Sequence, residues 1–124
     1  MIQYLASKNM EAVYFQYSGN KHKIVPGIGM VNMLWHGIES DLSVPVDYRI
    51  YDKETDGKTK NMHFCDMLKS ARDRGIRPDY VVIDTWYSSL NNLKYIRYFG
   101  WKWVTGLRKN RKVNRNVILC RYSR

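Results

Sequence analysis

The sequence has no acidic residue in its last third, and this absence fixes where its charge lies. Residues 1–84 hold 11 Lys or Arg and 11 Asp or Glu, whereas residues 85–124 hold 10 Lys or Arg and no acid. The whole net charge of +10 therefore comes from the last 40 residues. A block of one sign favours a polyanionic partner such as nucleic acid, the alternative being an ordinary solvated basic face.

Other absences exclude whole classes of protein. Two cysteines, Cys65 and Cys120, are too few for a disulfide scaffold, and they fit a reducing compartment. No apolar run reaches the roughly 18 residues that a membrane span needs, and residues 1–6 show no secretory signal pattern. A content of 44% apolar and 14% aromatic residues argues against disorder. We therefore expect a folded cytoplasmic protein with no membrane partner.

The first third of the chain favours β-strands. Residues 12–17 are aromatic and β-prone, and the turn formers that follow them break the chain. Residues 24–36 form a longer apolar run, whose ordered start Pro26 and Gly27 delay to about Ile28. Apolar side chains occupy both faces of this run, which predicts a strand covered on both sides.

A second strand is predicted over residues 44–51, after a polar turn at 37–43. The short connection makes the two strands an antiparallel hairpin. Alternation predicts three inward side chains in the second strand, namely Val46, Tyr48 and Ile50.

The middle of the chain favours a helix and then a strand. Thr59 can cap a helix that runs to about Arg74, where Gly75 ends it. The unbroken apolar run at residues 80–83 predicts a buried strand in the middle of a sheet.

The remaining residues continue the alternation of helix and strand. Ser88 or Ser89 can cap a second helix that ends at Gly100, and residues 101–107 predict a further strand. A basic loop at 108–116 and a last strand at 117–122 complete the pattern. The fold class is therefore α/β, a mixed sheet with helices packed on it, in which an antiparallel hairpin precedes parallel strands joined through helices.

Asp84 ends the predicted central strand, and it is the best candidate for a chemical role. Ligands gather beyond the carboxyl ends of strands in open α/β sheets, and a carboxylate there can bind a divalent metal. The alternative is that Asp84 caps the turn after the strand, as aspartate often does.

Several segments in order resemble the insertion-sequence transposases of the DDE superfamily, which are bacterial DNA-recombining enzymes. The resemblance covers about residues 7–112. The segment around Asp84, Val81-Val82-Ile83-Asp84-Thr85-Trp86-Tyr87-Ser88-Ser89, resembles the second-aspartate segment of that family. The other similar segments are residues 17–31, residues 44–51, Thr59-Lys60-Asn61 and residues 100–111.

The resemblance implies an RNase H-like domain that cuts and joins DNA ends. In that family three acids hold two Mg²⁺ (or Mn²⁺) ions, which activate the nucleophile and stabilise the leaving oxygen. Asp84 matches the second acid. Glu11 does not match the motif of the first acid, and the third acid, a glutamate in a Tyr-Arg-Glu-Lys signature, has no counterpart after Asp84. The resemblance thus divides the chain into a partial catalytic core at 1–107 and a basic segment at 108–124, truncated at both ends and inactive alone.

DNA-binding candidates flank Asp84. Trp86 and Tyr87 can stack on an unpaired base or pack on the top of the sheet. Five cations of the basic loop are candidates for phosphate contacts, the alternative being a plain surface loop; they are Arg108, Lys109, Arg111, Lys112 and Arg115.

Three functions fit these observations. The first is a transposase fragment that acts on transposon ends. The second is a non-enzymatic nucleic-acid-binding module that uses the basic end and its aromatic residues. The third is a regulatory fragment that pairs with another transposase copy.

Overall fold

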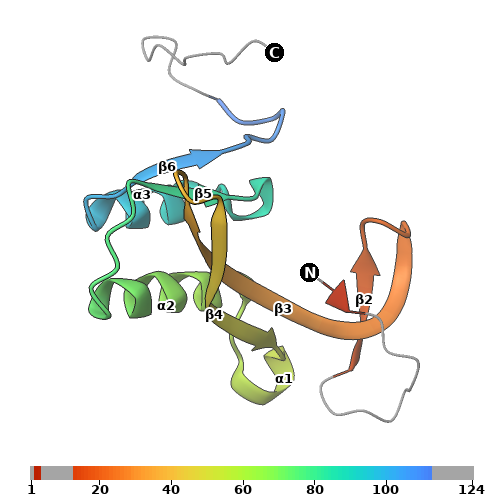
Figure 1. Cartoon of the computed structure of the whole chain (residues 1–124). Coiled ribbons are helices and arrows are strands. Elements are labelled where there is room, and N and C mark those ends of the chain that lie inside the picture. Colours follow the sequence, from red (N-terminus) through yellow and green to blue (C-terminus); the bar gives the residue numbers. More distant parts are fainter. Residues whose placement is uncertain (1, 4–12, 113–124) are drawn as a thin grey trace.

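A computed structural model describes residues 2–3 and 13–112, which fold into two small sheets and a layer of helices (Figure 1). One sheet contains β1 (Ile2–Gln3), β2 (Tyr14–Ser18), β3 (Lys23–Gly37) and β4 (Leu42–Tyr51), all antiparallel to their neighbours. The other pairs β5 (Tyr80–Ile83) with β6 (Lys102–Thr105) in parallel. The predicted α/β class and the order of strand types are therefore observed, whereas the predicted single sheet is divided in two.

β3 is the longest strand, and it begins earlier than predicted. It starts at Lys23 rather than near Ile28, because its first five residues pair with β2 in a hairpin that runs from Tyr14 opposite Gly27 to Ser18 opposite Lys23. Proline is tolerated at such a place because only β2 borders Pro26 among the described strands, so the missing N–H interrupts no second ladder.

Two predictions about burial are partly wrong. They are that β3 is covered on both faces and that alternate side chains of β4 point inward. Leu34 and Trp35 of β3 are exposed, so β3 is not covered on both sides. In β4, Tyr48 and Ile50 are also exposed, because they lie opposite Asn32 and Met30 on the uncovered face of the sheet. A register shift at Met33/Leu34 interrupts the simple alternation on which the prediction rested.

Arg49 and Tyr51 occupy the covered face of β4 instead. They lie opposite the buried residues Val31 and Gly29. The Tyr51 ring meets the edge of the His63 ring of α2 at 6.4 Å between centroids. The neighbouring helix, and not the apolar alternation, therefore selects which face of β4 points inward.

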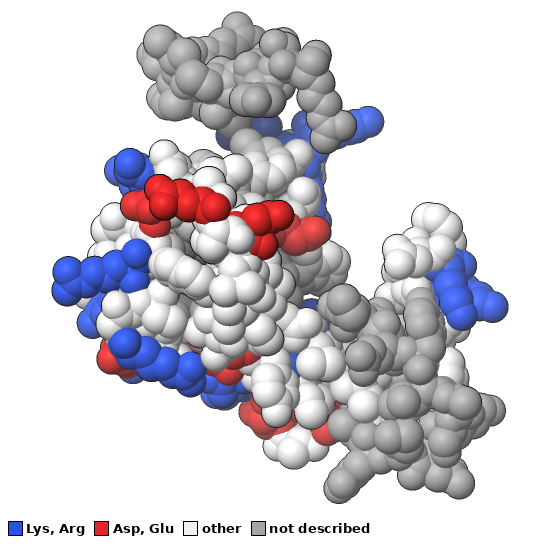
Figure 2. All heavy atoms as spheres, viewed as in Figure 1, with Lys and Arg blue, Asp and Glu red and all other residues white. Residues whose placement is uncertain are grey.

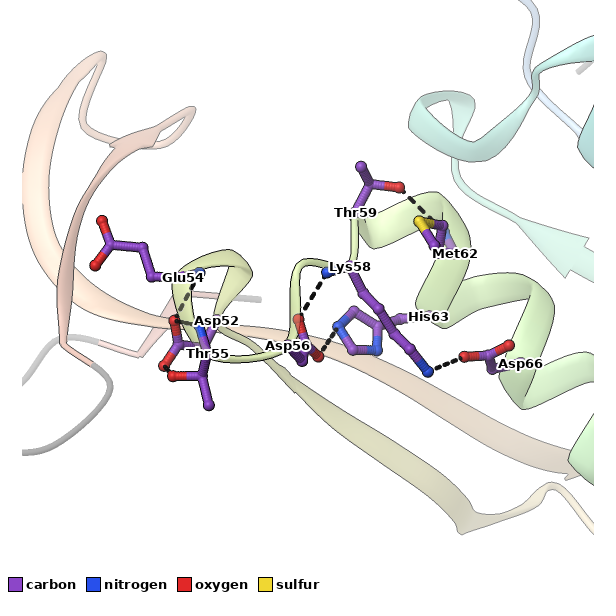
Figure 3. A network of polar contacts seen from close by, with 9 residues as sticks. All are labelled: Asp52, Glu54, Thr55, Asp56, Lys58, Thr59, Met62, His63 and Asp66. Carbon is purple, nitrogen blue, oxygen red and sulfur yellow. Dashed lines mark hydrogen bonds and ion pairs between the residues drawn. The ribbon is translucent and has the colours of Figure 1, made fainter.

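The connection between β4 and the long helix is fixed by a polar network (Figure 3). It contains the short helix α1 (Lys53–Asp56) and leads into α2 (Lys60–Asp73). Asp52 caps α1, and the hydrogen bond from the Thr55 hydroxyl is the main cause that lowers the pKa of Asp52.

One close polar contact and one ion pair join this connection to α2. Nε2 of His63 lies 3.1 Å from Asp56 Oδ2, and Nζ of Lys58 lies 2.7 Å from Asp66 Oδ2 (Figure 3). As predicted, Thr59 caps the helix, because its hydroxyl accepts the N–H of Met62. The start of α2 is therefore held by both caps and charges. No described helix is long and apolar enough to cross a membrane.

The second half of the chain contains two strands with a helix between them. After α2 the chain forms β5, the 3₁₀ turn η1 (Thr85–Tyr87), α3 (Leu90–Tyr98) and β6. Of the two candidates, Ser89 caps α3. The prediction that β5 is buried in the middle of a sheet is wrong, because within the described ranges it pairs with β6 alone, and Tyr80 and Val82 are exposed.

One core nevertheless lies under both sheets. Phe64 and Leu68 of α2 pack against Ile96 of α3, which is fully buried. The side chains that surround this cluster come from β3, β5 and β6 and include Met33, Val81, Ile83 and Trp103. The two sheets therefore share one helical layer, although among the described strands no ladder joins one sheet to the other.

Candidate functional site

Asp84 follows β5 directly and stands at the carboxyl end of that strand. Its Oδ1 accepts the N–H of Trp86 at 2.8 Å, so Asp84 caps η1. The residue is otherwise exposed to solvent. The carboxylate thus has the capping role that sequence analysis weighed, and its exposure leaves it accessible to a ligand.

The carboxyl end of β6 lies beside Asp84. Ile83 pairs with Thr105, so both strands end side by side. A Cβ added at Gly106 would lie 2.7 Å from Thr85 Oγ1, which shows how closely the chain after β6 approaches the turn after β5. A larger residue at 106 would therefore force the Thr85 side chain to move. In the sequence, the glycine itself is the only sign of this constraint.

Trp86 and Tyr87 take different positions. The Trp86 side chain is 59% exposed, and the Arg108 guanidinium lies over its ring at 5.5 Å. Tyr87 is half-buried and stacks on Phe64 of the core, with ring centroids 5.1 Å apart. Burial, and secondarily the charge of Asp84, raises the pKa of Tyr87. Of the two aromatic candidates, only Trp86 presents a face that a base could stack on.

The basic turn after β6 comprises residues 108–112, and it carries four of the five predicted phosphate ligands. All five of its residues are exposed, and the Arg111 N–H donates to Arg108 O at 3.0 Å. Arg115 and the predicted strand at 117–122 lie outside the described residues. The turn therefore places several cations beyond the same sheet edge as Asp84.

Asn92 of α3 holds η1 in place, a role that sequence analysis missed. Its side chain is buried, and Nδ2 donates both to Tyr87 O and to Asn61 Oδ1 of α2, each at 2.9 Å. Its Oδ1 accepts the Cys65 thiol, whose pKa burial raises. The sequence did contain a sign that Asn92 is buried. It lies one helical turn before the core residue Ile96 and therefore on the same face of the helix.

We expect Asn92→Ala to lower the free energy of unfolding by about 2 kcal/mol, because it leaves the Tyr87 carbonyl without its donor. Asn91→Ala is the matched control, since Asn91 is an exposed asparagine on the same helix and its loss is expected to cost less than about 0.5 kcal/mol. Urea unfolding followed by circular dichroism measures both. Equal midpoints for the two variants would contradict the assigned role.

The described residues do not build a metal centre by themselves. No three of their His, Cys, Asp or Glu side chains form a group that could hold a metal ion. Mg²⁺ needs several oxygen ligands, and Asp84 offers one carboxylate. A magnesium site at Asp84 would therefore need further ligands from residues beyond those described.

The comparisons with known proteins agree with this arrangement. A family profile described as DDE superfamily endonuclease matches residues 6–118. No curated protein and no solved structure matches the chain. The matched region includes β2 to β6, the helical layer and Asp84 with its turn. Since the match covers most of the sequence, the chain belongs to the DDE superfamily of endonucleases and contains a transposase-like domain of that family.

Proposed function

We propose that this chain is part of a metal-dependent DNA transposase of the insertion-sequence type, in which Asp84 supplies one carboxylate and the basic turn binds phosphate. The observation that carries the proposal is the position of three features at one sheet edge. Asp84, the exposed Trp86 ring and Arg108 all lie where β5 and β6 end. Family membership supports DNA as the substrate.

The role that we propose for each residue follows from its charge and its exposure to solvent. Exposed arginine and lysine side chains neutralise phosphate and fix the position of a DNA strand without reading its sequence. Trp86 offers an aromatic face for an unpaired base near the cleavage point. Asp84 contributes one oxygen donor to a magnesium or manganese ion, which would supply Lewis-acid activation of the phosphate when bound.

The 124 residues supply only part of this site, so we expect them to bind DNA without cutting it. In a plasmid assay with Mg²⁺ or Mn²⁺, the purified chain should produce no nicked product, because one carboxylate cannot hold two ions. Asp84→Asn should leave DNA affinity within about threefold. It also preserves the helix cap, since asparagine is an equally good capping residue.

Nicking by the unaltered chain, abolished by Asp84→Asn, would show that the missing acids are present and that the expected inactivity is wrong. No DNA binding at any salt concentration would instead remove the transposase proposal.

A second candidate is a DNA-binding module with no chemistry of its own. It is favoured by the lack of any three-residue metal-ligating group among the described side chains. The two candidates differ in one measurable respect. A transposase part should regain metal-dependent cleavage when the remaining acids are supplied by a longer chain or a second polypeptide, and a binding module should not.

A further inference from the structure

A projecting arm, made of β2 and the first five residues of β3, carries aromatic side chains that the Asp84 site does not use. Figure 1 shows this arm extending away from α2, α3 and the β5–β6 pair. Five consecutive residue pairs, from Tyr14 opposite Gly27 to Ser18 opposite Lys23, make it a regular antiparallel ribbon. The arm is therefore an ordered platform with two defined faces.

One face of the arm is covered and the other is open. Ser18 and Val25 are buried, and Gln16 donates its amide to Gly27 O at 2.9 Å. On the opposite face Phe15, Tyr17 and Ile24 are 73%, 63% and 67% exposed. Phe15 and Tyr17 share this face because they are two residues apart, and Tyr17 lies directly opposite Ile24.

The charge on the arm has one sign. Residues 12–38 contain Lys21 and Lys23 and no Asp or Glu. In Figure 2 the described atoms of this projection are blue or white, and none has the red of Asp or Glu. Lys21 lies in the turn at the tip of the arm, and Lys23 pairs with Ser18 and so belongs to the covered face, next to Ile24. An open aromatic face with cations at its tip is a combination by which proteins hold single-stranded nucleic acid, in which aromatic rings stack on bases and cations follow the backbone.

We propose that the arm is a second nucleic-acid contact that binds single-stranded DNA through stacking on Phe15 and Tyr17. The inference rests on the proposed DNA-binding function but concerns a surface separate from Asp84. A strand separates alternate side chains by about 6.8 Å. Bases in a duplex are stacked at about 3.4 Å, so the two rings fit an extended, unstacked strand better than a duplex.

The base of the arm sets the position of the bound strand. A cavity of about 440 Å³ there is lined by Phe15 together with Asp52, Lys53 and Glu54. The Asp52 carboxylate accepts the hydroxyls of Tyr14 and Thr55. The two acids outweigh the single lysine, so this lining carries a net negative charge that repels phosphate. The backbone of the bound strand therefore runs past the lysines at the tip, with its bases on the rings.

The test measures binding of the whole chain to a labelled oligothymidylate of about 20 nucleotides, by fluorescence anisotropy. Stacking is worth about 1–3 kcal/mol per base, so the double variant Phe15→Ala, Tyr17→Ala should lose about 30-fold or more in affinity. Affinity for a duplex of the same length should change less than about threefold. Phe15→Trp with Tyr17→Trp should restore binding, because each ring keeps an aromatic face.

The matched control removes two exposed tyrosines outside the arm, Tyr48 of β4 and Tyr98 of α3, by substitution with alanine. This pair should leave the affinity for oligothymidylate unchanged within about twofold, and all variants should melt as the unaltered chain does. Equal losses from both pairs, or equal losses on duplex and single strand, would overturn the arm as a stacking site.

Two further outcomes would distinguish a stacking site on the arm from a dimer interface and from duplex binding elsewhere on the chain. If the arm joined two copies of this chain, light scattering would show a dimer that the arm variant dissociates while affinity for oligothymidylate stays constant, and the proposal would be wrong. If the unaltered chain bound duplex but not oligothymidylate, the arm proposal would fail and the proposed function would stand. Binding to neither would remove both.

Discussion

Replacing Ile96 with alanine is expected to lower the free energy of unfolding by about 3–4 kcal/mol. Ile96 is fully buried between α2 and α3, where it contacts Phe64 and Leu68. Removing its outer carbons leaves a cavity that two helices and two sheets border, and such a site cannot collapse easily. A domain of this size has roughly 10 kcal/mol of stability, so the change removes about a third of it.

Leu90→Ala provides the control for this experiment. Leu90 lies on the same helix but is 59% exposed, so its loss should cost less than about 0.5 kcal/mol. Urea titration of both variants, followed by circular dichroism, should separate their midpoints while the slope stays constant. Equal midpoints, or a loss below about 1 kcal/mol for Ile96→Ala, would show that α2, α3 and the sheets do not form one core.

Neutralising the basic turn is expected to produce the largest change in DNA binding. Each lysine or arginine that contacts a phosphate contributes about 0.9 to the slope of log affinity against log salt for duplex DNA. Replacing all four cations by glutamine should therefore reduce the slope by up to about 3.6 and lower affinity at 0.1 M salt by roughly a thousandfold. The substituted residues are Arg108, Lys109, Arg111 and Lys112.

Net charge alone is tested by a second fourfold variant. It neutralises four exposed cations outside the turn: one on α1, one on α2, one just after α2 and one on α3. They are Lys53, Lys69, Arg77 and Arg97. Both variants lose four charges, so a purely nonspecific effect would give the same salt slope in each. A clearly smaller slope for the turn variant is the expected result, and similar slopes would contradict a localised phosphate site.

Much of the local structure follows from short-range signals. Thr59 caps the helix that it was predicted to cap, and Ser89, one of two candidates, caps the next. Gly75 and Gly100, both with positive φ, follow the helix ends. These signals are reliable because a cap or a left-handed glycine depends on a few neighbouring atoms. The hairpin between β3 and β4 was predicted for the same reason.

The errors arise where distant parts of the chain decide burial. Tyr48 and Ile50 alternate as inward residues should, yet α2 packs on the other face of β4 and contacts Tyr51. The apolar run of β5 has the composition of a central strand, but within the described ranges only β6 pairs with it. Composition cannot show whether a neighbouring strand is present, because that depends on chain far away in sequence.

The sequence by itself determined the fold class, the caps, the acid-free basic end and Asp84 as the residue at the end of a strand. Each of these is a local or compositional property, readable without knowledge of packing. Only the tertiary structure decided that Tyr87 stacks in the core while Trp86 faces solvent beneath Arg108, and that Asn92 holds their turn. It also divided the sheet in two and left the aromatic face of the arm open. These outcomes depend on which surfaces meet, and close packing between distant segments, not local preference, settles that.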